Sequence, residues 1–364
     1  MTTSPTVPVF VIGYMRSGTS LLRNILASHP AVFASPGETK YFEYQTTIRR
    51  LYPDLGQDQI LTGLITTLAD IVNNGRGVKL ETDPTGYRPT GYALPPSVLE
   101  TLNAQVRQNR EYGAVFRVVM DYYARQTGKI HWLEKTPQHT FFIDEIVRSI
   151  PDARFVEIVR DPRAVLASKK RFKDTARTTE RFNEDLRKVK MMQRVYDPFW
   201  DTLAWRLAVR AVKKAKTLYP EQIITVQYEQ LIAEPENTIR PVCEFLDLPF
   251  AARMLDLEAL RQEAGFRLDY GSFSTDPLDR WKNKLPPAEI ALCQHLVGGQ
   301  MKSLGYAPVA VPAGQQAKIP LLLGRSGFEF FWRLYKRWRL GGMMFLWNTL
   351  RNYGQQVRKL VTRQ

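Results

Sequence analysis

Short apolar runs and longer stretches of helical spacing alternate along this chain. Three runs rich in β-branched residues predict buried strands at residues 8–13, 154–159 and 222–227. Apolar residues recur at helical spacing between and after these runs, which predicts helices over residues 19–28, 164–172, 183–218, 235–246 and 286–304. Strands that alternate with helices indicate an α/β fold, in which helices flank a parallel β-sheet.

The C-terminal part of the chain follows a different pattern. Residues 307–320 are rich in proline, alanine and glutamine, which predicts a linker. Residues 321–364 place aromatic and aliphatic side chains at helical spacing, with basic side chains largely off that face. We therefore expect a folded domain over residues 1–306, a linker over residues 307–320 and an amphipathic helical appendage over residues 321–364.

Composition adds one unusual number, the net charge. The chain has 364 residues, with 51 Lys and Arg against 36 Asp and Glu, so its formal net charge is +15. Residues 169–216 hold 15 basic and 6 acidic residues, and residues 321–364 hold 9 basic residues and 1 acidic residue. These two blocks account for the whole excess. A basic excess points to an anionic partner, but a nearly neutral remainder argues against a nucleic-acid-binding protein.

Other features of the composition narrow the class. The 44% hydrophobic and 24% charged residues are ordinary for a globular protein, which excludes a disordered or collagen-like chain. The two cysteines and four histidines show no ligand spacing, so we expect neither a disulfide framework nor a metal site. The N-terminus lacks the segments of a signal peptide, and no apolar run is long enough to span a membrane. These observations predict a cytoplasmic protein.

The most specific motif is a loop between the first predicted strand and the first predicted helix. Its sequence, GYMRSGTS, has the Gly13-x4-Gly18 spacing of a Walker A loop, but Thr19 stands where that motif requires lysine. Arg16 supplies a positive charge, and Thr19 and Ser20 supply hydroxyl donors. The backbone N–H groups of such a loop form an anion cradle at a helix N-terminus. We favour a phosphate-like ligand over an ordinary glycine turn.

Four weaker motifs follow along the chain, and each taken alone fits a structural role as well. Glu38, in the turn PGETK, is either a general base or a solvated turn residue, and Lys135 is a further cation. Arg160 at a strand end and Ser168 in the next helix suit a phosphate, but also suit a capped helix beside an exposed arginine. Residues 271–285 offer hydroxyl donors, a cation and an aromatic face on which a base could stack, including Ser274, Arg280 and Trp281.

Together, and in this order over residues 8–306, the motifs resemble the sulfotransferases that use 3′-phosphoadenosine 5′-phosphosulfate (PAPS). The likeness is greatest to the group that contains bacterial and protein-tyrosine sulfotransferases. It implies a P-loop-type sheet and a sulfotransferase domain over residues 1–306. The likeness also implies that the 5′-phosphosulfate is held by Arg16, Ser17, Gly18, Thr19 and Ser20, and the 3′-phosphate by Arg160 and Ser168. Further nucleotide contacts are implied for Tyr228, Ser274, Arg280 and Trp281.

The same resemblance implies a mechanism. An acceptor hydroxyl or amine attacks sulfur, Glu38 takes the acceptor proton, and Arg16 and Lys135 stabilise the developing charge without a metal. The late loop is only loosely matched, and Phe172 stands where some relatives carry an arginine. Two alternatives stay open: a P-loop nucleotide-dependent kinase, for which the Walker lysine is missing, and a non-enzymatic membrane-associated anion-binding protein.

The expected partners follow from this assignment and from the tail. The acceptor is a small molecule, a glycan or a lipid, and nucleic acid is not an expected partner. The basic, aromatic tail is typical of an interfacial anchor on an anionic membrane, which would place the protein on the inner face of a membrane. The alternative is a helical pair that docks on the domain or on another protein.

Overall fold

The computed structural model describes residues 6–74, 93–178, 196–256, 258–260 and 276–332. The chain divides into two compact units. Unit 1 contains Met1–Val159 and Val212–Ser274, and unit 2 contains Arg160–Ala211 and Thr275–Gln364. The second boundary falls inside helix α9 (Pro198–Leu218), so the two ends of this helix belong to different units.

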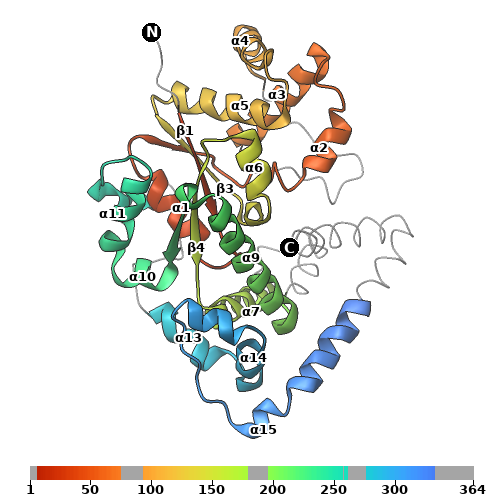
Figure 1. Ribbon diagram of the computed structural model, residues 1–364, viewed down its shortest axis with the longest axis vertical. Helices are drawn as coiled ribbons and strands as arrows, with labels where there is room; N and C mark the ends of the chain where they lie inside the picture. The colour runs from red at the N-terminus through yellow and green to blue at the C-terminus, as the bar shows by residue number, and fades with distance from the viewer. Residues whose placement is uncertain (1–5, 75–92, 179–195, 257, 261–275, 333–364) are drawn as a thin grey trace. The chain divides into compact units, whose positions relative to one another are not determined.

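Unit 1 is built on a parallel five-stranded sheet with the order β2-β3-β1-β4-β5 (Figure 1). The strands are β1 (Val7–Ile12), β2 (Val32–Ala34), β3 (His131–Lys135), β4 (Arg154–Val159) and β5 (Ile223–Gln227). Val9 of β1 is paired with Leu133 of β3 on one side and with Arg154 of β4 on the other. The predicted parallel α/β architecture is therefore confirmed, and β1, β4 and β5 are the three strands that the sequence identified.

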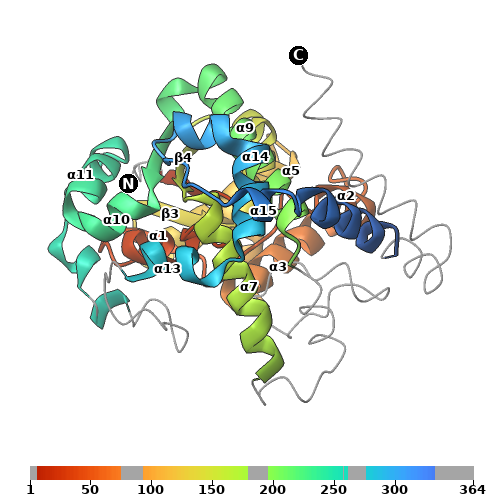
Figure 2. The same ribbon diagram turned by 90° about the horizontal axis from the view of Figure 1, so that it is seen from below.

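Helices lie on both faces of this sheet, as Figures 1 and 2 show. On one side are α1 (Thr19–Ala27), α10 (Tyr228–Ala233) and α11 (Pro235–Phe245). On the other side are α3 (Asp58–Asn74), α5 (Tyr112–Gln126) and α6 (Ile143–Ser149). The remaining short elements of unit 1 are α2 (Gln45–Leu51), α4 (Pro96–Val106), η1 (Pro137–Phe141), η3 (Pro220–Gln222) and η4 (Ala252–Leu255).

The alternation of side chains along the strands explains why both faces are covered. Phe10 and Ile12 of β1 are fully buried in one large core with residues of α3, α5 and α6. Val9 and Val11, which alternate with them, are also fully buried and point to the opposite face. A strand that is apolar at every position needs a layer on each side, which is the arrangement of a parallel sheet.

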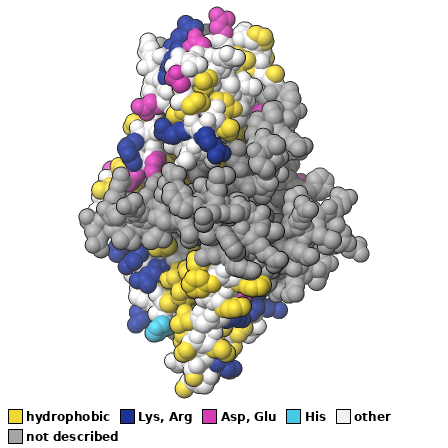
Figure 3. Space-filling model, turned by 90° about the vertical axis from the view of Figure 1, so that its right-hand side faces the viewer, with side chains coloured by type: hydrophobic (Ala, Val, Ile, Leu, Met, Phe, Trp, Pro, Cys, Tyr) yellow, Lys and Arg dark blue, Asp and Glu magenta, His cyan; other side chains and the backbone are white. Residues whose placement is uncertain are grey.

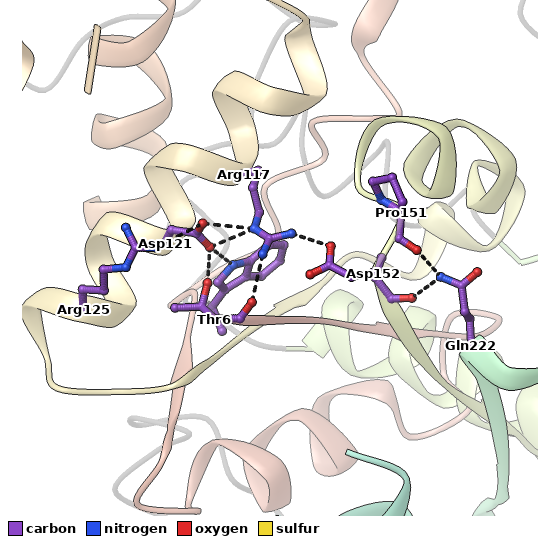
Figure 4. Close-up of polar contacts among 9 residues, drawn as sticks. Thr6, Arg117, Asp121, Arg125, Pro151, Asp152 and Gln222 are labelled. Carbon is purple, nitrogen blue, oxygen red and sulfur yellow. Dashed lines mark hydrogen bonds and ion pairs between the residues drawn. The ribbon is translucent and has the colours of Figure 1, made fainter. Parts of the chain in front are cut away.

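A polar network fastens α5 to the edges of this core (Figure 4). The Arg117 guanidinium donates to Asp121 at 3.0 Å, to Asp152 at 2.5 Å and to the backbone oxygen of Thr6 at 2.9 Å. Asp121 also accepts the indole N–H of Trp132 at 2.7 Å. One arginine thus joins α5 to the start of β1 and to the loop before β4.

Unit 2 is helical in its described part. It contains α7 (Pro162–Thr178), the first part of α9, α13 (Asp276–Lys284), α14 (Pro287–Ser303) and α15 (Ala313–Gln316). Residues 319–332 are also helical, so the predicted appendage has a C-terminal helix, while residues 333–364 lie outside the described part of the chain. Residues 307–320, predicted as a linker, include the short helix α15.

The prediction of one continuous helix over residues 183–218 is wrong at residues 196–197. The structure begins α9 at Pro198, and residues 196–197 before it are not helical. Asp197 explains this start, because its Oδ1 accepts the N–H groups of Phe199 at 3.0 Å and Trp200 at 3.1 Å. Proline at the first helical position reinforces the same boundary. Residues 183–195 of the predicted helix lie outside the described residues.

Candidate active site

The loop between β1 and α1 is shaped to receive an anion. Gly13 and Gly18 have positive φ angles of 143° and 102°, and Arg16 between them has a φ of 68°, in the left-handed region. A Cβ atom at Gly13 would lie 2.3 Å from the carbonyl oxygen of Ile158, so the backbone approaches too closely for any other residue. No side chain of the described residues caps α1 at Gly18. The first N–H groups of α1 thus lack a side-chain acceptor, as at helix N-termini that bind anions.

The side chains of this loop offer further donors. Ser17 is fully buried, and its Oγ has no hydrogen-bond partner among the residues that the structure describes. Burying a hydroxyl without a partner is costly, so a ligand or water that pairs with it is expected. Thr19 is buried, whereas Arg16 and Ser20 are exposed. The residues predicted to bind the 5′-phosphosulfate therefore lie together in this loop and in the first turn of α1.

Tyr228, the first residue of α10, packs directly on the same loop. Its side chain is 3% exposed, and a Cβ atom at Gly18 would lie 2.4 Å from its Cδ2 atom. The structure thus brings Tyr228, which the sequence placed near the nucleotide, against the loop predicted to bind the phosphosulfate.

Glu38 and Lys135 are in direct contact. Glu38 lies in the turn after β2, Lys135 ends β3, and Lys135 Nζ donates to Glu38 Oε1 at 2.6 Å. The Glu38 side chain is 34% exposed and that of Lys135 is 14% exposed, so an acceptor could reach the carboxylate. The sequence identified each residue but did not predict their pairing. A carboxylate that can take a proton beside an ammonium that can stabilise negative charge suits the transfer of an anionic group.

The neighbouring Glu134 was missed by the sequence reasoning. Its carboxylate is fully buried and accepts the Thr39 N–H at 3.0 Å, the Thr39 hydroxyl at 2.9 Å and the Thr136 hydroxyl at 2.6 Å. His139 Nδ1 lies 2.9 Å from its second oxygen. Burial alone would raise the pKa of Glu134, but His139 and these donors outweigh burial and hold the pKa below its ordinary value. The hydroxyls beside Glu38 and Lys135 are the sequence signal that could have indicated this cluster.

In unit 2, Arg160 and Ser168 lie at the start of α7. Arg160 directly follows β4 and is 8% exposed, and its backbone oxygen accepts the indole N–H of Trp205 at 3.0 Å. Ser168 is half-buried on α7. The predicted strand–Arg–helix–Ser arrangement is thus present, and the role of the two residues in binding a 3′-phosphate stays a prediction.

The predicted nucleotide contacts near residue 280 differ in accessibility. Trp281 is 4% exposed, and the Arg163 guanidinium lies 4.1 Å from its ring centroid. That face of the indole is covered by a cation and is not open to a base. Arg280 is exposed on α13, and Ser274 lies outside the described residues.

Two lysines that begin the first basic block are paired within unit 2. Lys169 Nζ lies 2.5 Å from Asp201, with both side chains almost completely buried. Lys170 lies 3.4 Å from Glu289, which also accepts the Tyr196 hydroxyl at 2.5 Å. These acidic partners neutralise part of the charge that the sequence concentrates here.

Comparison with known proteins identifies the class that this fold and site define. Residues 8–252 match the Sulfotransferase family, so the chain belongs to that family. Protein-tyrosine sulfotransferase 1 of Danio rerio is 22% identical over 330 residues, which are 87% of this chain and 77% of that protein. Omega-hydroxy-beta-dihydromenaquinone-9 sulfotransferase Stf3 of Mycobacterium bovis is 22% identical over 258 residues, 66% of this chain and 63% of that enzyme.

Carbohydrate sulfotransferase 5 of Mus musculus is 28% identical over 193 residues, which cover 49% of this chain and 48% of that protein. Among solved structures, the sulfotransferase domain from the curacin biosynthetic pathway aligns with 84% of this chain and 99% of its own, at 18% identity and a TM-score of 0.46. The family assignment makes the protein a transferase of sulfuryl groups.

In the described part of the chain, no three His, Cys, Asp or Glu side chains are grouped so that they could hold a metal ion. None of the helices placed by the structure combines the length and the hydropathy that crossing a bilayer requires.

Proposed function

We propose that this protein transfers the sulfuryl group of PAPS to an acceptor hydroxyl or amine. The observation that carries the proposal is the loop after β1. In this loop the buried Ser17 hydroxyl has no hydrogen-bond partner among the described residues, and the N-terminus of α1 that follows has no side-chain cap among them. Such a loop fits a phosphosulfate group, whose oxygens accept hydrogen bonds from N–H and O–H donors. Membership of the sulfotransferase family supports the same co-substrate.

The residues of the site then take distinct roles. Arg16, Ser17, Thr19 and the loop N–H groups hold the 5′-phosphosulfate, and Arg160 and Ser168 hold the 3′-phosphate. The acceptor oxygen or nitrogen attacks sulfur, the bond from sulfur to the phosphate oxygen breaks, and 3′,5′-adenosine bisphosphate (PAP) leaves. Glu38 takes the acceptor proton. Lys135, which lies 2.6 Å from Glu38, stabilises the charge that develops on the leaving phosphate.

Ligand-induced thermal stabilisation tests the co-substrate. A ligand that binds only the folded state raises the melting temperature, so PAP without magnesium should stabilise the protein. In the same assay, ATP with magnesium tests the kinase alternative and a DNA duplex tests the nucleic-acid alternative. Stabilisation by ATP with magnesium and none by PAP would refute the proposal in favour of a kinase.

Glu38→Ala tests the base. We expect turnover of labelled PAPS to fall by about a hundredfold, since general base catalysis contributes about 10²–10⁴-fold. PAP binding should be retained, because Glu38 is not assigned to the nucleotide. Glu100→Ala, which removes an exposed glutamate of α4, is the matched control. Full turnover in Glu38→Ala would show that another group takes the proton.

We propose a lipid or glycan at a membrane surface as the acceptor class. The helix over residues 319–332 presents Leu321, Phe328 and Phe331 with side chains 75%, 69% and 69% exposed. Figure 3 shows hydrophobic side chains gathered over this part of unit 2. Large apolar side chains exposed together are unusual on a soluble surface. The sequence after this helix, residues 333–364, holds eight basic residues and no acidic residue, a charge that complements an anionic leaflet.

Sedimentation of the full chain with vesicles tests this surface. The wild type should sediment with vesicles that contain phosphatidylglycerol and remain in solution with pure phosphatidylcholine vesicles. The double variant Phe328→Ser/Phe331→Ser should lose this binding and keep PAP binding. Leu51→Ser, at an apolar residue that is 48% exposed in unit 1, is the control and should bind like the wild type. Equal sedimentation of the double variant and the wild type would refute the membrane surface. Self-association of the wild type that the double variant abolishes would also refute it, because the apolar side chains would then join copies of this chain.

A further inference from the structure

The buried Glu134 carboxylate joins two segments that are distant in sequence. It lies on β3 and accepts two hydrogen bonds from Thr39, which is 95 residues away, at 3.0 and 2.9 Å. The Lys40 N–H donates to the Thr136 hydroxyl at 3.2 Å, and that hydroxyl itself donates to Glu134 at 2.6 Å. Three hydrogen bonds therefore connect residues 39–40 to the end of β3, and the bond from Thr136 to Glu134 links their acceptors.

Few other backbone contacts hold the turn that carries Glu38. The preceding strand β2 has only three residues and pairs with β3 alone. The last backbone hydrogen bond between them is donated by the Ser35 N–H to Leu133 at 2.9 Å. The bonds to Glu134 and Thr136 therefore hold the turn that carries Glu38 on the end of β3, together with the hydrogen bond that Arg23 donates to the Ser35 backbone oxygen at 3.0 Å.

We call the hydrogen bonds that Glu134 accepts from Thr39 the latch. Each of these two residues is also the chain neighbour of a candidate catalytic residue. Thr39 follows Glu38, and Glu134 precedes Lys135. Successive strand residues point to opposite sides, so Glu134 points into the protein while Lys135 reaches Glu38 at 2.6 Å. A displacement of the latch would move both members of the Glu38–Lys135 pair.

We infer that Glu134 is a positioning residue, which fixes Glu38 against Lys135 for sulfuryl transfer by holding the Thr39 turn on the end of β3. The inference rests on the function proposed above. The Thr39 N–H, the Thr39 hydroxyl and the Thr136 hydroxyl all donate to Oε1 of Glu134, so the amide oxygen of a glutamine keeps these contacts but loses the negative charge that strengthens them. Glu134→Gln therefore keeps the size of the side chain and weakens the latch.

Steady-state kinetics and PAP binding test the inference. Glu134→Gln should lower kcat by about ten- to a hundredfold, since small displacements of reacting groups cost rates of this order. The Kd for PAP and the KM for PAPS should stay within about twofold, because Glu134 is not part of the anion loop. Glu157→Gln, the same change at a buried glutamate of β4, should keep wild-type kcat.

A second pair of variants decides the matter if Glu134→Gln does not fold. Thr39→Val keeps the shape of the side chain and loses the hydroxyl, whereas Thr39→Ser keeps the hydroxyl. We expect kcat to fall in Thr39→Val and to recover in Thr39→Ser, with PAP binding unchanged in both. Wild-type kcat in Thr39→Val, or a parallel loss of kcat and PAP binding, would overturn the positioning role. Absence of PAPS turnover in the wild type would instead refute the proposed function, and the positioning role with it.

Discussion

Replacing Gly18 by alanine tests how tightly the anion loop is held. The added Cβ would lie 2.4 Å from Cδ2 and 2.9 Å from Cε2 of Tyr228, inside van der Waals contact. The backbone at Gly18 has a φ of 102°, which L-residues with a side chain rarely adopt. Left-handed backbone costs about 1–2 kcal/mol for such a residue. Forcing an extra atom against a packed ring adds about 1–3 kcal/mol.

A second glycine separates these two costs. Gly128 also has a positive φ, of 67°, but a Cβ atom there would meet nothing within 4 Å. Gly128→Ala should therefore lower the free energy of unfolding by the backbone cost alone, about 1–2 kcal/mol. Gly18→Ala should lose about 1–3 kcal/mol more, because the Tyr228 ring must move.

Urea unfolding of both variants, with PAP binding by calorimetry, provides the measurements. We expect the PAP affinity of Gly18→Ala to fall at least tenfold, since relief of the clash displaces the N–H groups at the start of α1. Gly128→Ala should bind PAP like the wild type. Equal stability of the two variants would refute the packing of Tyr228 on the loop. Unchanged PAP affinity in Gly18→Ala would refute the loop as the anion site.

Two further predictions concern buried charge. Burial raises the pKa of Glu157 to about 7, from 4.5, so stability from this group is full below about pH 4.5 and is lost as the pH rises through about 7. This loss amounts to about 3 kcal/mol in the free energy of unfolding of the wild type. Glu157→Gln cannot ionise and should not show it, which urea unfolding at pH 5 and pH 8 measures. Asp161→Ala should cost about 3–5 kcal/mol, because it removes the carboxylate that lies 2.6 Å from the buried Arg163 guanidinium and balances its charge. Glu236→Ala, which breaks an exposed pair with Arg240, should cost less than about 1 kcal/mol in the same assay.

The sequence predicted those strands in which β-branched and other apolar side chains predominate. β1 and β4 lie inside the sheet and are recognisable from a short run without reference to the rest of the chain. β3 was missed because it carries His131, Glu134 and Lys135 among its five residues. Their partners are remote: His131 Nε2 bonds to the backbone oxygen of Leu246, which is 115 residues away. A polar residue can be buried in a strand when a distant residue bonds to it, and the neighbouring sequence does not show that partner.

In the candidate site too, features that are local in sequence could be predicted and contacts between distant residues could not. The anion loop is continuous in sequence, so its glycine spacing, its cation and its hydroxyls could be identified together. The contact between Glu38 and Lys135 depends on β2 and β3 being neighbours, although 97 residues separate the two side chains. The cover over one face of Trp281 could not be predicted either, because Arg163 belongs to another helix of unit 2.

The pairing of Lys169 and Lys170 with acidic residues has a consequence for ionic strength. A formal charge counts every lysine alike, but a distant ion responds to the field that remains after buried partners cancel. The Lys169–Asp201 pair is nearly closed to solvent, so added salt screens it little. The pair is already neutral within the formal net charge, so the salt-sensitive attraction that this protein exerts on anions arises from cations at the surface, such as Arg16 and Arg171, and not from Lys169.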